Sequence, residues 1–162
     1  MFVRAKKVKG RYYGYLVDNK WVDGKVRQKV KKYLGPIREL SDTGSDLYFD
    51  LDTTTSSRSC LRDCIAQEFI SRGFARVKNR LKKEDLTIDL VTGRIRSGNK
   101  SVVLFLNGRY LHDTLLRHLL SFNEPESEED TPGKRLARAF SDAGIGIDKT
   151  VFILLYKKLY RS

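Results

Sequence analysis

The residues best suited to chemistry are the cations of the first 35 positions, where eleven Lys and Arg stand against two Asp. This segment has a net charge of +9, whereas the other 127 residues carry 21 bases and 18 acids, a net charge of +3. Clustered ammonium and guanidinium groups bind polyanions, because each neutralised phosphate releases a condensed counterion. The expected partner is a nucleic acid, with duplex DNA favoured over RNA.

The spacing of these cations predicts that they line one face of a β-sheet. Every second residue from Lys25 to Lys31 is basic, so these side chains point to one side of a strand. A ribbon of two or three strands fits the major groove of B-DNA. Guanidinium groups fork onto guanine, which favours Arg4 and Arg27 for base edges and the lysines for phosphates. The candidate contacts from the residues alone are Arg4, Lys6, Arg11, Lys25, Arg27, Lys29 and Lys31.

Two tyrosines, Tyr13 and Tyr15, share a face of the second predicted strand. If that face is exposed, their rings could stack on bases or bond to phosphate. The alternative is that they form the apolar side of the sheet and pack against the rest of the protein.

Three short strands should position these side chains. They are expected at residues 2–8, 11–17 and 26–34. Each of these runs is rich in Val or Tyr or alternates between basic and other residues, as strands do. Lys9-Gly10 marks the first turn. The second turn is expected over residues 18–24, where Asp23-Gly24 is a strong hairpin signal.

The remaining sequence predicts a linker and a mixed domain. Residues 37–58 are rich in Ser, Thr, Asp and Gly, which is typical of a linker. Apolar residues recur at helical spacing over 60–83, and they alternate with polar residues in strand-like fashion within 86–106. Further helices are expected around Leu111–Phe122 with Asp113 as cap, from Thr131-Pro132 to about Ala143, and after Asp148, with an acidic loop at 123–130.

These elements predict an α+β fold. A basic three-stranded antiparallel sheet, residues 1–36, is followed by the linker 37–58 and by a mostly helical α+β domain, residues 59–162, with a second small antiparallel sheet. No apolar run approaches the ~18 residues of a transmembrane helix, and the N-terminus lacks the apolar stretch of a secretory signal. The sequence therefore indicates a cytoplasmic protein without a membrane partner, and it leaves the oligomeric state open.

Two further constellations could support metal or enzyme chemistry. Cys60, Cys64, His112 and His118 could supply four zinc ligands, but histidines six apart diverge on a helix, so no metal or other cofactor is expected. His112 could serve as a general base in a small metal-dependent nuclease. Its neighbour Asp113 points elsewhere on any regular element, so the residues at 106–113 are better explained as an Asn-Gly turn followed by a helix cap.

The opening FVRAKKVKGRYYGYLV…GKVRQKVKKYLG resembles the N-terminal segment of DDE-type insertion-sequence transposases. In that group, too, a basic strand leads through an aromatic strand to a Gly-Lys-Val-Arg-Gln strand that ends in Leu-Gly. The resemblance covers about 35 of the 162 residues. It implies a DNA-contacting arm that contains Arg4, Lys6, Lys25, Arg27, Gln28 and Lys29. The remaining residues are too few for a ribonuclease-H-like core with its insertions, so transposition chemistry is not implied.

The function that these observations favour is non-enzymatic binding of nucleic acid through the basic sheet. One alternative is an interaction module whose basic face meets RNA, the ribosome or an acidic protein. The other alternative is the small metal-dependent nuclease.

Overall fold

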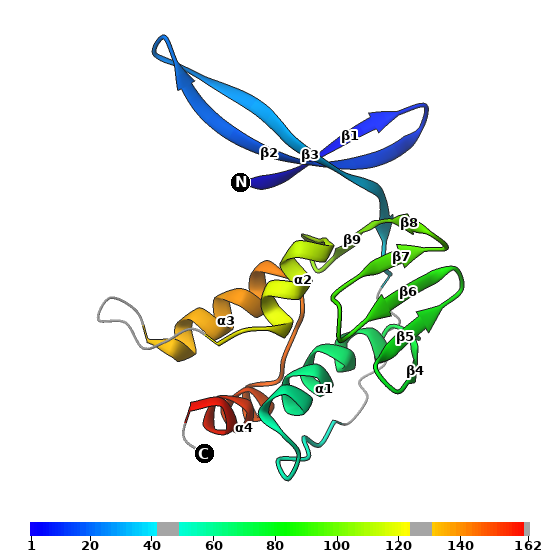
Figure 1. Ribbon diagram of the computed structural model, residues 1–162, viewed down its shortest axis with the longest axis vertical. Coiled ribbons are helices and arrows are strands. Elements are labelled where there is room, and N and C mark those ends of the chain that lie inside the picture. Colours follow the sequence, from blue (N-terminus) through cyan, green and yellow to red (C-terminus); the bar gives the residue numbers. More distant parts are fainter. Residues whose placement is uncertain (42–48, 124–130, 161–162) are drawn as a thin grey trace.

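The computed structural model describes residues 1–41, 49–123 and 131–160. These residues form four helices and two five-stranded sheets, which confirms the predicted α+β class (Figure 1). The elements are β1 (Phe2–Val8), β2 (Arg11–Val22), β3 (Lys25–Glu39), α1 (Ser57–Ile70), β4 (Ala75–Val77), β5 (Arg80–Lys83), β6 (Leu86–Asp89), β7 (Ile95–Ser97), β8 (Lys100–Ser101), β9 (Val103–Leu106), β10 (Arg109–Leu111), α2 (Asp113–Leu120), α3 (Pro132–Asp142) and α4 (Lys149–Tyr160).

Strands β1, β2 and β3 form two consecutive antiparallel hairpins with two-residue turns. Both residues of each turn, Lys9-Gly10 and Asp23-Gly24, have positive φ, the conformation that matches the twist of a tight hairpin. The prediction that residues 18–24 form a longer turn was wrong. Residues 18–22 continue β2, because they pair with β3 as far as Val22 opposite Lys25. The second hairpin is therefore longer than the first.

The first sheet has five strands and mixed pairing, which corrects the predicted three-stranded antiparallel sheet. Its order is β1-β2-β3-β9-β10, and β3 runs parallel to β9. β3 continues through Pro36, where a stop was expected, and Ile37 pairs with Val103. Residues 37–39, expected to begin a linker, are thus part of a strand. Of the rest of that expected linker, residues 42–48 lie outside the described residues.

A pair of glycines joins the N-terminal hairpins to the body of the protein. Gly14 and Gly35 are buried and lie opposite each other on β2 and β3. A Cβ on Gly14 would lie 3.0 Å from the Cγ2 atom of Val103, and a Cβ on Gly35 would overlap the backbone carbonyl of Ser101. This close approach requires residues without side chains, so these two glycines set how the hairpins sit on β8 and β9.

Replacing Gly35 by Ala is expected to lower the free energy of unfolding by at least about 2 kcal/mol. Its φ of +122° is unfavourable for any L side chain, and the new methyl group would have to displace the Ser101 backbone. Urea denaturation of the full chain measures the effect. Gly24→Ala is the matched control, because Gly24 also has positive φ but meets nothing within 4 Å. Equal losses in the two variants would contradict this account of the joint.

The second sheet is an antiparallel meander in the order β4-β5-β6-β7-β8. The prediction of helical structure over 60–83 is correct only for its first part. α1 ends at Ile70, and β4 and β5 then form a hairpin whose turn contains Lys78 at positive φ. Phe74 and Leu81 have the spacing of residues on one helix face. In the structure Phe74 directly precedes this hairpin, Leu81 belongs to it, and both side chains are buried in the core. The strand at 86–89 has the predicted alternation, with Leu86 and Ile88 buried.

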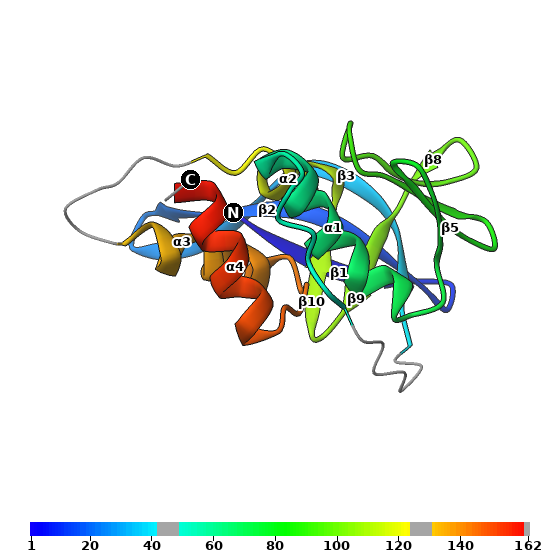
Figure 2. The same cartoon turned by 90° about the horizontal axis from the view of Figure 1, so that it is seen from below.

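The helices pack beside the second sheet around one apolar core, which includes Leu61, Phe69 and Phe140 (Figure 2). Two predicted helix starts are confirmed: Thr131 accepts a hydrogen bond from the Lys134 amide, and Asp148 accepts from Thr150 and Val151. The predicted Asp113 cap was wrong, because His112 occupies the N-cap position of α2. Within the described ranges, no helix is long and apolar enough to cross a membrane.

Candidate nucleic-acid interface

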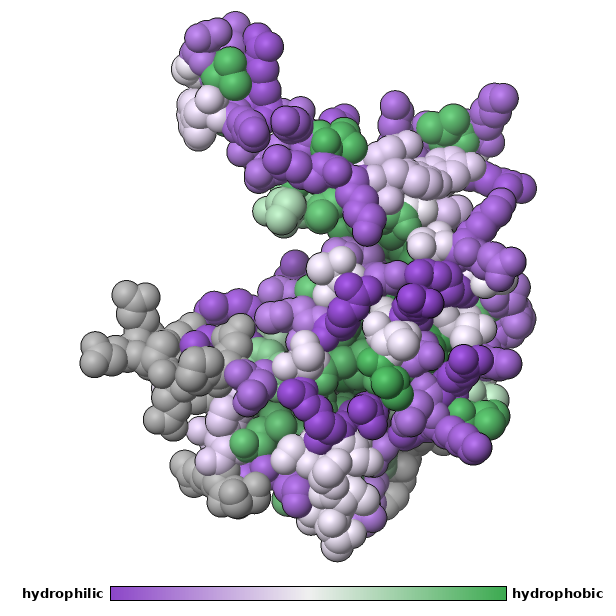
Figure 3. Space-filling view, viewed as in Figure 1, coloured by the Kyte–Doolittle hydropathy of each residue, from purple (hydrophilic) through white to green (hydrophobic). Residues whose placement is uncertain are grey.

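The distal part of the second hairpin projects from the body as a two-stranded arm, residues 18–29. β1 pairs with β2 only between Arg11 and Val17, so beyond that point β2 and β3 pair with each other alone. All residues from 19 to 33 are exposed. The ribbon and space-filling views show the arm extending clear of the helices, with a hollow between arm and body (Figures 1 and 3).

One face of the arm carries four cations. In an antiparallel pair, residues directly opposite each other point to the same side. The register places Lys20 opposite Arg27 and Lys25 opposite Val22, and Lys29 follows Arg27 by two residues on the same strand face. We call this set the basic face: Lys20, Lys25, Arg27 and Lys29.

The basic face contains one pair of like charges that opposes the folding of the arm. Lys20 and Arg27 are like charges in directly opposed positions, an arrangement that is destabilising in a sheet. Asp18, opposite Lys29, is the only acid on this side of the arm strands. Three of the four cations therefore face no carboxylate on the opposite strand.

The other candidate residues lie on the opposite face of the sheet. Arg4 is opposite Tyr15, Lys6 is opposite Tyr13, and both pairs point away from the side that carries Gly14. Because the Gly14 side packs on Val103, the tyrosines are not directed at the body there. We call this side the tyrosine face: Arg4, Lys6, Arg11, Tyr13, Tyr15, Gln28 and Tyr33.

The structure thus divides seven of the eight candidates between two faces instead of one, and the eighth, Lys31, lies at a β-bulge. Arg4 and Gln28 are joined by a 2.7 Å hydrogen bond from the guanidinium to the amide oxygen. This bond crosses β2, since Arg4 is on β1 and Gln28 is on β3. Arg27, on the basic face, is the one arginine of the arm. Its guanidinium forms no hydrogen bond or ion pair with another described residue.

Lys31 leaves the expected alternation because of a β-bulge. The register shifts between Leu16 and Val17, whose partners are Lys32 and Val30, so Lys31 has no direct partner. Lys32 takes the strand face that alternation had assigned to Lys31. Burial lowers the pKa of His112 in the body, and the positive charge of Lys32 lowers it further. Simple alternation therefore fails where the arm meets the body.

The cations of residues 1–35 form no ion pair with a carboxylate of the described chain. Five ion pairs lie instead between residues 38 and 113, and an example is the 2.7 Å contact of Arg38 with Asp85. In that pair, hydrogen bonds from Arg38 and Ser97 hold the pKa of Asp85 well below its usual range. The body thus neutralises many of its own charges, while the N-terminal sheet leaves its cations available for a partner.

The arrangement around His112 gives no support to the nuclease alternative. Asp113 accepts hydrogen bonds from the Arg96 guanidinium at 2.7 Å and from the Ile95 amide at 2.8 Å, so its carboxylate is engaged away from the imidazole. The Nδ1 atom of His112 is buried and has no hydrogen-bond partner among the described residues, and burial lowers the pKa of this group. Among the residues that the structure describes, no three His, Cys, Asp or Glu side chains gather as metal ligands.

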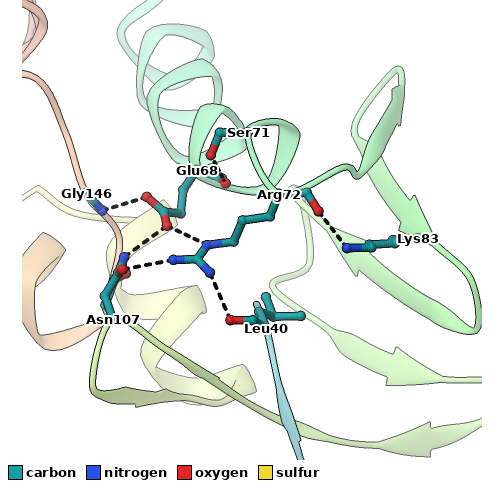
Figure 4. Close-up of polar contacts among 8 residues, drawn as sticks. Leu40, Glu68, Ser71, Arg72, Lys83, Asn107 and Gly146 are labelled. Carbon is teal, nitrogen blue, oxygen red and sulfur yellow. Dashed lines mark hydrogen bonds and ion pairs between the residues drawn. The ribbon is translucent and has the colours of Figure 1, made fainter. Parts of the chain in front are cut away.

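Sequence reasoning missed a polar network around the buried guanidinium of Arg72 (Figure 4), which lies beside a hollow of about 970 Å³ in the body. Glu68 accepts hydrogen bonds from Arg72, from Asn107 and from the Gly146 amide. Arg72 also donates to the Leu40 carbonyl at 2.9 Å and to the Asn107 side chain at 2.8 Å. These contacts join elements distant in sequence and use the donors of the guanidinium, so the network is best explained as structural.

Comparison with known proteins adds no relative of this chain. No family model matches it, and neither a curated protein nor a solved structure is significantly similar. The residues and the geometry described above are therefore the basis for inferring a function.

Proposed function

We propose that this protein binds nucleic acid, with duplex DNA preferred, through the basic face of its arm. The observation that carries the proposal is the set of four cations on a projecting two-stranded ribbon, with two of them directly opposed. Such a ribbon has the width to enter the major groove of B-DNA. The deep, narrow major groove of A-form RNA does not admit it, which favours DNA as the duplex.

Within this proposal the four side chains have different roles. Arg27 contacts a base edge, because its guanidinium can donate two parallel hydrogen bonds to guanine. Lys20, Lys25 and Lys29 contact phosphates as point charges. The resemblance of the opening to DDE-type transposase arms supports DNA contact by Lys25, Arg27 and Lys29, but it does not include Lys20. Binding, rather than catalysis, is the proposed activity of the whole chain.

The test is a salt titration of the full-length protein with a fluorescently labelled DNA duplex. Three phosphate contacts predict a log–log slope of about −2.7, so affinity should fall about 40-fold between 0.05 and 0.2 M salt. Polyglutamate and a hairpin RNA serve as competitors. A flat titration would overturn the proposal, because the basic face would then not bind through its charges. Equal competition by polyglutamate would overturn it in favour of general polyanion or acidic-protein binding.

A further inference from the structure

The tyrosine face carries a cluster of three aromatic rings from two neighbouring strands. The ring centroids of Tyr15 and Tyr33 are 5.2 Å apart, and those of Tyr13 and Tyr33 are 6.4 Å apart. Tyr33 is 51% exposed, whereas Tyr13 and Tyr15 are half-buried. An exposed ring supported by two others is a rigid surface on which a flat ligand can stack.

A hollow of about 430 Å³ lies next to this cluster. Tyr13 and Tyr33 line it together with Arg11 and Lys100, and its floor includes the backbone at Gly35. This volume is within the range of pockets that hold small ligands. Two rings and two cations around one hollow suit a ligand that is both flat and anionic.

The charge on this face determines which occupant fits. The strand residues that point to this side include Arg4, Lys6 and Arg11, and none of them is an acid. A second copy of the chain docked here would bring these cations toward their duplicates without a carboxylate to separate them. Bases joined by phosphates satisfy both features, because their rings stack and their charges pair with the cations.

We infer that the tyrosine face is a second nucleic-acid site, which binds a stretch of unpaired nucleotides. A base stacks on Tyr33 in the hollow beside Tyr13, and the adjoining phosphates contact Arg11 and Lys100. The inference rests on the proposed function, because it assumes that nucleic acid is the partner. Since the basic face lies on the other side of the same ribbon, the protein would hold a junction between duplex and single strand.

The experiment compares an oligothymidylate with a duplex on the full-length protein, Tyr33→Leu and Tyr33→Phe. Leucine removes the stacking ring, so single-strand affinity should fall roughly 5- to 100-fold while duplex affinity stays unchanged. Phenylalanine keeps the ring and should retain most of the affinity. Arg11→Ala, which alters no ring, should also weaken only the single strand. An oligouridylate run in parallel shows whether DNA or RNA supplies the unpaired bases.

Several outcomes would overturn this inference while leaving the proposed function intact. One is unchanged single-strand affinity in Tyr33→Leu and Arg11→Ala while the duplex still binds the wild type. Another is loss of single-strand binding only when the basic face is altered. If Tyr33→Leu instead changes the mass in sedimentation without changing single-strand affinity, the face joins two copies of the chain. Failure of the wild type to bind any nucleic acid would remove the proposed function as well.

Discussion

Changing the four cations of the basic face to alanine together is expected to lower affinity for duplex DNA by about three orders of magnitude at 0.1 M salt. Three lost phosphate contacts abolish the release of about 2.7 counterions, each of which contributes about tenfold at this concentration, and the base contact of Arg27 is lost as well. The variant is K20A/K25A/R27A/K29A, and fluorescence anisotropy with the same labelled duplex measures the loss. The salt slope should also fall toward zero, because little counterion release remains.

The matched control removes four exposed cations from the body instead. Lys78, Lys82, Arg94 and Lys157 are exposed, and K78A/K82A/R94A/K157A has the same net charge as the arm variant. If overall charge alone attracts DNA, the two variants will lose affinity equally, and that result would contradict a specific role for the arm. The arm variant should fold normally, because removing the opposed charges of Lys20 and Arg27 relieves a repulsion.

The features of the arm that could be predicted from sequence are local ones. Asp23-Gly24 specifies a tight turn through its positive φ values, and the alternation from Lys25 to Lys29 correctly predicts a shared strand face. The bulge at Lys31 could not be predicted, because an extra residue in a strand leaves no mark on composition. Assigning Arg4 and Lys6 to the same face as Lys25 failed for a related reason: alternation within one strand says nothing about its register against the next.

The features that sequence reasoning missed depend on contacts between distant segments. The third strand was expected to end at residue 34, yet β3 passes through Pro36 and pairs in parallel with β9, more than sixty positions later. The tyrosine cluster needs Tyr33 to lie beside Tyr15, and this requires the register that the bulges set. Polar partners such as the buried Arg72 and Asn107 on its loop are likewise brought together by topology, which propensity and periodicity do not encode.

Replacing Arg72 by Met is expected to lower the free energy of unfolding by about 3–5 kcal/mol. Arg72 is only 5% exposed, and its guanidinium is the charge partner of Glu68 at 2.8 Å. Methionine fills similar space but leaves the carboxylate of Glu68 buried without a cation, and the Leu40 carbonyl and Asn107 side chain without donors. Chemical denaturation of the full chain measures the loss.

Two variants distinguish a buried ion pair from simple loss of packing at Arg72. Arg80→Met removes a guanidinium that is 63% exposed and lies 3.7 Å from Asp89, so it should cost less than about 1 kcal/mol. The double variant Glu68→Gln with Arg72→Met removes both charges, and it should be more stable than Arg72→Met alone because no carboxylate is left uncompensated. The double variant could instead be less stable than Arg72→Met. That result would mean that the main contribution of Glu68 is to accept hydrogen bonds from the Asn107 side chain and the Gly146 amide, rather than to pair with a charge.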